Sequence, residues 1–201
     1  LSDLGHRQSA AVGAALKRRS VTPDAVFIGA QKRHRQTWDG IESALGTGLA
    51  PIVIPGWNEF DFGGLLEARY ANRDDKPAGL HDDRKTHFRI LRHTVREWQR
   101  DEVENPPESF AAFTDRVREA RAIVAASDAK TPLAVSSGGA IGRTIADVLD
   151  APAEQMILLQ LQVKNCAVAR LVMAKGHTWL NGFNETPHID GSNQDEMLTY
   201  S

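Results

Sequence analysis

The most informative stretch of the chain is residues 134–141, Ala134-Val135-Ser136-Ser137-Gly138-Gly139-Ala140-Ile141. An apolar run ends there in two serines and two glycines, and apolar residues return at Ile141, Ile145 and Leu149. Helical spacing after such a break predicts a buried strand, a tight turn and the start of a helix. Glycines let a ligand approach the backbone, and the free N–H groups of a first helical turn attract anions. The stretch predicts a phosphate site, with a ligand-free glycine turn as the equally weighted alternative.

Other apolar runs with strand character recur along the chain, at residues 25–28, 51–55, 167–173 and 178–183. The basic turn 31–35 opens a helix between the first two, and Lys175-Gly176 joins the last two into a hairpin. Alternating strands and helices imply an α/β fold with a mostly parallel sheet covered on both faces, a three-layer α/β/α sandwich. We expect strands 25–28, 132–136 and 167–173 to lie in one sheet.

The chain of 201 residues suits one domain, 1–201, that is long enough to bury a core. Residues 65–107 are polar and charged and contain one amphipathic helix, which predicts a helical cap inserted into that domain. Such a cap is where substrate specificity would reside.

Composition excludes several classes of partner. The formal net charge of -2 argues against nucleic-acid binding and against a polybasic membrane surface. The single cysteine, Cys166, rules out an internal disulfide and fits a reducing compartment, and no apolar run is long enough to span a membrane. We expect a cytoplasmic protein, with a homodimer as the default oligomeric state.

Two charged residues follow predicted strands, where ligands of open α/β sheets bind. Arg33 offers a guanidinium fork suited to phosphate, or else belongs to a solvated basic turn. Glu59 lies among Trp57, Phe60 and Phe62, whose apolar rings would raise its pKa towards that of a general acid; a capping or ion-paired Glu is the alternative. The seven histidines show no zinc spacing, so no metal site is expected.

Five segments, taken in order, resemble motifs of the histidine phosphatase superfamily, also called phosphoglycerate mutase-like. They are 1–9 (its "Leu-Thr-x-x-Gly-x-x-Gln-Ala" helix start), 32–37 ("Arg-Ala-x-x-Thr"), 57–63 ("Leu-x-Glu-x-x-x-Gly"), 135–141 ("Val-Ser-His-Gly-Gly-x-Ile") and 164–168 (an Asn-containing strand). The resemblance covers most of the chain except the cap.

The resemblance implies that Arg33, Ser137 and Gly138 bind phosphate, that Glu59 is the proton donor, and that no cofactor is needed. Family catalysis also uses an "Arg-His-Gly" strand whose histidine takes the phosphoryl group, and that strand would precede Leu1. Ser137 stands where the family has a second histidine that donates to the phosphoryl group. A shorter, neutral hydroxyl stabilises the transferred charge less well, at a cost on the order of 10²–10³ in rate.

Three functions follow. The first is a phosphatase of small phosphorylated substrates, acting through the upstream histidine. The second is a catalytically degenerate member that binds a phosphorylated ligand or a protein. The third is a serine hydrolase using Ser137, although the first glycine of the Gly-x-Ser-x-Gly elbow is missing and His188 is an unconvincing base. For the first function, Ser137→His is expected to leave activity unchanged or raise it if the imidazole fits.

Overall fold

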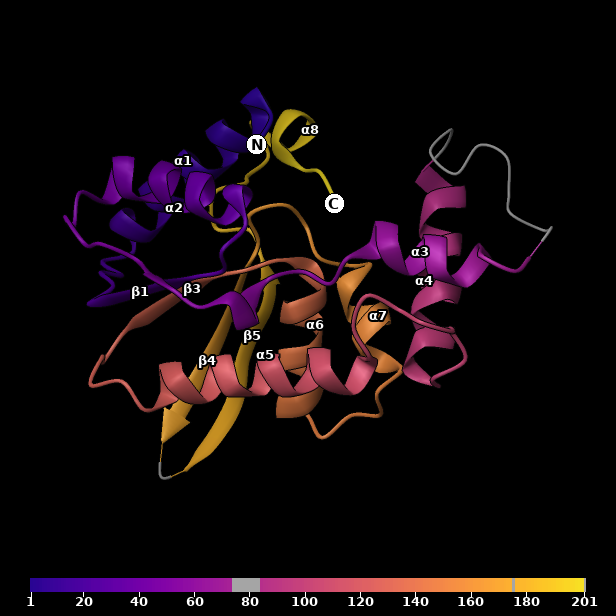
Figure 1. Ribbon diagram of the computed structural model, residues 1–201. Helices are drawn as coiled ribbons and strands as arrows, with labels where there is room; N and C mark the ends of the chain where they lie inside the picture. Colours follow the sequence, from indigo (N-terminus) through magenta and orange to yellow (C-terminus); the bar gives the residue numbers. More distant parts are fainter. Residues whose placement is uncertain (74–83, 175, 201) are drawn as a thin grey trace.

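Three short parallel strands form the central sheet of the computed structural model, which describes residues 1–73, 84–174 and 176–200 (Figure 1). They are β1 (Ala25–Ile28), β2 (Ile52–Val53) and β3 (Pro132–Val135), and their order in the sheet is β2-β1-β3. Phe27 on the central strand lies opposite Ile52 on one side and Ala134 on the other. The apolar runs at 25–28 and 132–135 therefore form strands, as the sequence predicts. Of the run 51–55, only Ile52 and Val53 are in a strand, because Pro55 begins a 3₁₀ turn.

Nine helical segments accompany the strands. They are α1 (Asp3–Arg18), α2 (Lys32–Leu45), the 3₁₀ turn η1 (Pro55–Trp57), α3 (Phe62–Tyr70), α4 (Arg84–Gln99), α5 (Phe110–Ala125), α6 (Gly138–Val148), α7 (Gln155–Gln160) and α8 (Gln194–Met197), counted over the described residues. Ser2 caps α1 by accepting a hydrogen bond from the Gly5 N–H at 3.1 Å, which satisfies a free donor of the first turn. The basic turn 31–35 enters α2, as expected.

Successive side chains of β1 point to opposite faces of the sheet, and each face has its own hydrophobic cluster. Val26 and Ile28 face α1 and α2, where Trp38 and Ile41 are buried with them. Phe27 points to the opposite face and joins a second cluster that contains Phe113 of α5. Helices α1 and α2 thus cover one face of the sheet and α5 and α6 cover the other (Figure 1). This is the three-layer α/β/α sandwich that the sequence predicts.

The late strands depart from one expectation. β4 (Val168–Ala174) and β5 (His177–Glu185) form the predicted antiparallel hairpin, but they make a separate two-stranded sheet. The prediction that 167–173 shares a sheet with 25–28 and 132–136 is therefore wrong for the described residues. Apolar alternation shows that a segment is extended, but it does not specify the strand with which it pairs, and among the described residues β4 pairs with β5.

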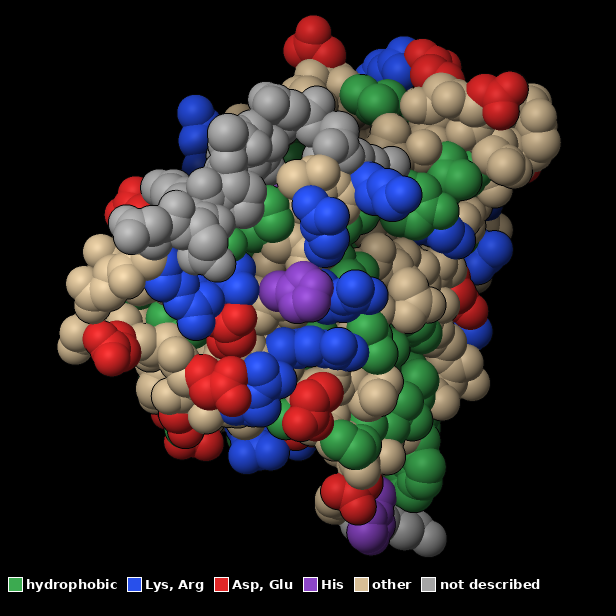
Figure 2. Space-filling model, turned by 90° about the vertical axis from the view of Figure 1, so that its right-hand side faces the viewer, with side chains coloured by type: hydrophobic (Ala, Val, Ile, Leu, Met, Phe, Trp, Pro, Cys, Tyr) green, Lys and Arg blue, Asp and Glu red, His purple; other side chains and the backbone are tan. Residues whose placement is uncertain are grey.

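Helices α3 and α4 occupy the part of the chain expected to be a cap. The two lie against each other, and Lys and Arg side chains gather on the face of the molecule where they lie (Figure 2). α4 reaches the core through Trp98, whose ring centroid is 5.1 Å from that of Phe60. That 65–107 acts as a cap stays a prediction, and its residues 74–83 lie outside the described part of the chain. Among the described helices, none is long and apolar enough to cross a membrane.

Candidate functional site

The predicted site residues meet where the parallel strands end. β1 leads through a short turn into α2, which carries Arg33 in its first turn, and β3 leads through Ser137 into α6. Because parallel strands end at the same edge of a sheet, the N-termini of α2 and α6 are brought together there. The positive ends of two helix dipoles at one edge favour an anion between them.

Ser137 forms the centre of a short hydrogen-bond cluster. It occupies the N-cap position of α6, but its side chain makes no capping hydrogen bond. Its Oγ instead accepts a hydrogen bond from Arg33 Nε at 3.0 Å and lies 2.7 Å from His34 Nε2. Arg33 is solvent-exposed, so its guanidinium remains accessible to a ligand. The structure therefore joins Arg33 and Ser137, which are 104 residues apart in the chain.

His34 is a member of this cluster that sequence reasoning missed. In the sequence it stands in a basic turn and is one of seven histidines without zinc spacing, yet it is 1% exposed and contacts Ser137. Burial, and next the Arg33 charge, lower the pKa of His34 to about 4, so its ring is neutral near pH 7. The available signal was its place next to Arg33 in the turn after a strand.

This lowered pKa gives a prediction about acid stability. Between pH 6.5 and about 4 the unfolded chain binds a proton at His34 that the native protein does not, so the native state loses stability as pH falls through this range. We expect His34→Gln to reduce that part of the pH dependence of the free energy of unfolding. Urea denaturation at pH 7 and pH 4.5 measures it, with exposed His93→Gln as the control. An equal pH dependence in both variants would contradict the assignment.

Glu59 lies in the loop that follows η1, beside the start of α6. Its Oε2 accepts a hydrogen bond from the Gly139 N–H at 2.9 Å, and its own N–H donates to Gln31 Oε1 at 3.2 Å. Desolvation raises the pKa of the Glu59 carboxyl, opposed by the Gly139 N–H and by the charges of Arg33 and Arg116. The direction of this shift is the one expected of a proton donor near neutral pH.

Hydrogen bonds from three other parts of the chain hold the loop that carries Glu59. Arg116 of α5 donates to the backbone oxygens of Gly56 at 3.0 Å and Asn58 at 2.7 Å. Ser136 Oγ donates to the backbone oxygen of Trp57 at 2.7 Å. The Asn58 side chain accepts from the Ala30 N–H at 2.6 Å, which ties the loop to the turn before α2. These contacts keep the carboxyl of Glu59 beside the same helix N-terminus as Ser137.

The closeness of Glu59 requires a glycine at position 139 of α6. A Cβ at Gly139 would lie 2.0 Å from Glu59 Oε1 and 2.7 Å from the Phe60 ring, and one at Gly138 would lie 4.0 Å from Glu59 Oε2. Only a residue without a side chain fits at 139 in this arrangement. Gly138 follows Ser137 as the first residue of α6, and its contact with phosphate stays a prediction.

We expect Gly139→Ala to displace the Glu59 carboxyl and to weaken any reaction that uses it by at least about 10²-fold. Gly63→Ala on α3 is the control, since a Cβ there would have only one close neighbour, the Asp61 side chain at 3.4 Å. Hydrolysis rates and thermal melting of both variants separate an effect on the site from unfolding. Equal activity of the two folded variants would contradict this account of Glu59.

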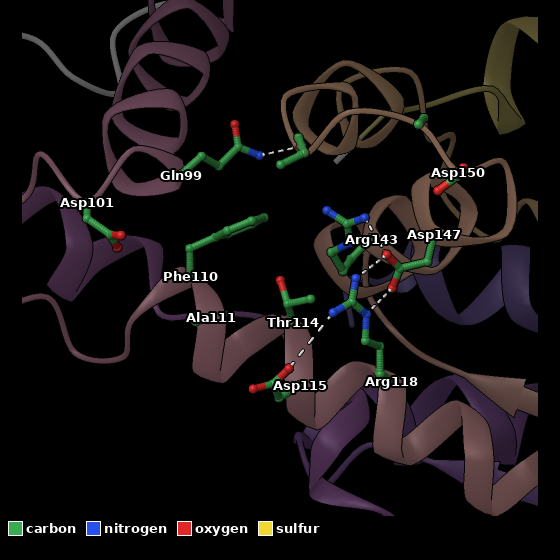
Figure 3. A pocket seen from close by; sticks show the side chains of 12 residues that line it. Gln99, Asp101, Phe110, Ala111, Thr114, Asp115, Arg118, Arg143, Asp147 and Asp150 are labelled. Atoms are coloured by element: carbon green, nitrogen blue, oxygen red, sulfur yellow. Dashed lines mark hydrogen bonds and ion pairs between the residues drawn. The ribbon is translucent and has the colours of Figure 1, made fainter.

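The cavity in Figure 3 lies away from these residues. It has a volume of about 380 Å³ and is lined by α5, the C-terminal half of α6 and neighbouring loops, without Arg33, Glu59 or Ser137. Asp147 there already accepts hydrogen bonds from Arg118 at 2.9 Å and from Arg143 at 2.5 Å. Its strongest charges are therefore paired with each other.

Other reactive side chains offer no competing centre. Burial raises the pKa of the Cys166 thiol to about 11, so it is a poor nucleophile near neutral pH. Among the described residues, no three His, Cys, Asp or Glu side chains are grouped so that they could hold a metal ion.

Comparisons with solved structures place this fold in a known class. An alpha-ribazole phosphatase from Shigella flexneri is 22% identical, with a TM-score of 0.68 over 92% of this chain and 84% of its own. YhfR of Bacillus stearothermophilus is 19% identical, with a TM-score of 0.69 over 94% and 87%. A mycobacterial glucosyl-3-phosphoglycerate phosphatase, solved with inorganic phosphate, is 18% identical, with a TM-score of 0.64 over 94% and 89%. These likenesses define a phosphoglycerate mutase-like α/β fold.

The family follows from the sequence itself. The family model described as "Histidine phosphatase superfamily (branch 1)" matches residues 1–186. The chain therefore belongs to branch 1 of the histidine phosphatase superfamily, which confirms the resemblance seen in its motifs. No curated protein matches the chain.

Proposed function

We propose that this protein is a phosphatase of small phosphorylated substrates that works through a phosphohistidine. The observation that carries the proposal is the meeting of Arg33, Ser137 and Glu59 at the N-terminus of α6, with Arg33 Nε 3.0 Å from Ser137 Oγ and Glu59 bonded to the Gly139 N–H. Membership of the histidine phosphatase superfamily supports it. The nucleophile is a histidine on the segment that precedes Leu1 in the full protein.

In the first step, this histidine attacks phosphorus in line with the leaving group, so that a P–N bond forms as the P–O bond of the ester breaks. Arg33, Ser137 and the Gly138 N–H hold the non-bridging oxygens, where negative charge is concentrated. Glu59 gives its proton to the leaving alcohol oxygen. In the second step, water attacks the phosphorus of the phosphohistidine while Glu59 takes a proton from that water. A P–O bond forms as the P–N bond breaks, which frees the histidine and releases inorganic phosphate.

Exposed cations on α4 favour an anionic substrate. The helix carries Lys85 and Arg89 on its surface, and the face on which it lies presents Lys and Arg interspersed with Asp and Glu (Figure 2). Positive charge there raises the local concentration of phosphorylated molecules. A homodimer and a cytoplasmic location remain predictions.

Two other functions keep a specific observation in their favour. A binder without turnover is favoured by Ser137, a weaker phosphoryl donor than the family histidine. A serine hydrolase is favoured by the 2.7 Å separation of Ser137 Oγ and His34 Nε2, which gives Ser137 a neighbouring base that His188 does not provide.

Hydrolysis of an aryl phosphate at pH 5–7 by the protein with its natural upstream segment tests the three functions. We expect slow turnover, and none from residues 1–201 alone, because they lack the nucleophile. Labelling of Ser137 by a fluorophosphonate probe, with the aryl phosphate left intact, would instead identify a serine hydrolase. Phosphate binding with no turnover of any ester by the longer protein would identify a binder.

A further inference from the structure

Ser137 has two partners on its hydroxyl, and they are neighbours on α2. Arg33 Nε approaches Ser137 Oγ to 3.0 Å, and His34 Nε2 approaches it to 2.7 Å. The Ser137 hydroxyl makes no capping bond to α6, so its direction is set by these two side chains. Side chains on α2 thus orient the hydroxyl of Ser137, which itself stands at the N-terminus of α6.

The chemistry of the partners fixes the direction of these hydrogen bonds. A guanidinium has donors only, so Ser137 Oγ accepts from Arg33. His34 Nδ1 is buried against the Gly29 backbone, a polar contact that raises the pKa of His34, but it makes no hydrogen bond of good geometry to the described residues, whereas Nε2 lies 2.7 Å from Ser137 Oγ. The ring proton is best satisfied on Nε2, from which it donates to Ser137 Oγ. The hydroxyl then accepts twice, and its own hydrogen is free to donate to a ligand.

We propose that His34 is a positioning residue that acts through Ser137, orienting its hydroxyl and strengthening it as a donor to the transferred phosphoryl group. Incoming hydrogen bonds polarise an O–H group and make it a better donor. The role rests on the proposed phosphatase function. It also accounts for two departures from the family motifs together, since His34 stands at the alanine of "Arg-Ala-x-x-Thr" and Ser137 at the histidine of "Val-Ser-His-Gly-Gly".

The ring of His34 has little freedom to move. A Cβ at Gly29 would lie 2.2 Å from His34 Nδ1 and 2.6 Å from its Cε1, so the turn after β1 packs directly on the imidazole. An imidazole placed at position 137 would have to enter space next to His34 Nε2, only 2.7 Å from the present Oγ. Whether Ser137→His preserves activity depends on space for the new imidazole, and we expect the ring of His34 to occupy that space.

The test uses the protein with its upstream segment and compares kcat for an aryl phosphate. We expect His34→Leu, which fills the space without a donor, to lower kcat about tenfold, the effect of one hydrogen bond. His34→Gln keeps an N–H at a similar reach and should recover most of that loss. Ser137→His alone should lose activity, and the double variant His34→Ala/Ser137→His should regain part of it because the second ring now has room.

A second measurement separates this inference from the proposed function. The affinity for orthovanadate is measured for the parent protein and for each variant, and we expect weaker binding in His34→Leu. The tautomer of His34 is determined in the parent protein by ¹⁵N NMR, and we expect the proton on Nε2. Weaker vanadate binding by His34→Leu, with no turnover by the parent protein, would remove the phosphatase function and leave His34 as the residue that orients Ser137 toward a bound anion. Unchanged kcat and vanadate affinity in a folded His34→Leu variant would overturn the role of His34 even in an active phosphatase.

Discussion

Arg33→Ala is expected to lower kcat/KM for an aryl phosphate by about 10³-fold or more. Arg33 is the cationic side chain that donates a hydrogen bond to Ser137 at the N-terminus of α6. In phosphoryl transfer, charge accumulates on the non-bridging oxygens, and a guanidinium fork stabilises two of them at once. Its removal also leaves the Ser137 hydroxyl with one partner fewer.

Arg35→Ala is the matched control for this variant, because Arg35 lies in the same turn of α2 and is also exposed. It removes the same charge from the molecule without touching Ser137, so its activity should stay within about threefold of the parent protein. Steady-state kinetics with the longer protein measure both. Equal losses from the two variants would mean that Arg33 acts only through long-range charge, and no loss from Arg33→Ala would contradict the site.

Glu59→Gln is expected to lower the hydrolysis of alkyl phosphates by about 10²–10⁴-fold. Gln has the shape of Glu, and its side-chain oxygen still accepts from the Gly139 N–H, which Glu59 now binds at 2.9 Å. What it lacks is a proton for the leaving oxygen. An alkoxide needs that proton, whereas a nitrophenolate leaves without it, so aryl phosphates should lose much less.

The raised pKa of Glu59 predicts the direction in which the hydrolysis rate changes with pH. Burial raises the pKa of Glu59, so the protonated form persists to higher pH than for an ordinary Glu. The rate on alkyl phosphates should fall as pH rises through that raised pKa, and Glu59→Gln should remove this limb. Exposed Glu67→Gln on α3 is the control. A Glu59→Gln variant that keeps the limb would assign it to another group.

Local patterns in the sequence were sufficient for the layers and for most of the site. The glycine-rich break after Val135 marks the start of α6, and parallel topology then places Arg33 and Ser137 at one edge. The aromatic neighbours of Glu59 indicate the direction of its pKa shift, because apolar burial disfavours a charged carboxyl.

The sequence pattern does not predict which distant segments contact each other. The pairing of β4 with β5 alone depends on which sheet edges are within reach, and strand alternation does not encode this. The contact of His34 with Ser137 depends on the approach of α2 to α6, which a single histidine in a basic turn does not reveal. Arg116, which donates hydrogen bonds to the Glu59 loop, lies 58 or more residues along the chain from the backbone oxygens that accept them.

The most direct test of the account is to find where the phosphoryl group is held during turnover. The longer protein is mixed with a ³²P-labelled phosphate ester, quenched within one turnover, and mapped by peptide analysis. We predict an acid-labile, base-stable label on a histidine upstream of Leu1, which disappears in Arg33→Ala and accumulates more slowly in Glu59→Gln with an alkyl ester. An acid-stable label on Ser137, or turnover with the upstream histidine replaced by alanine, would contradict the central claim.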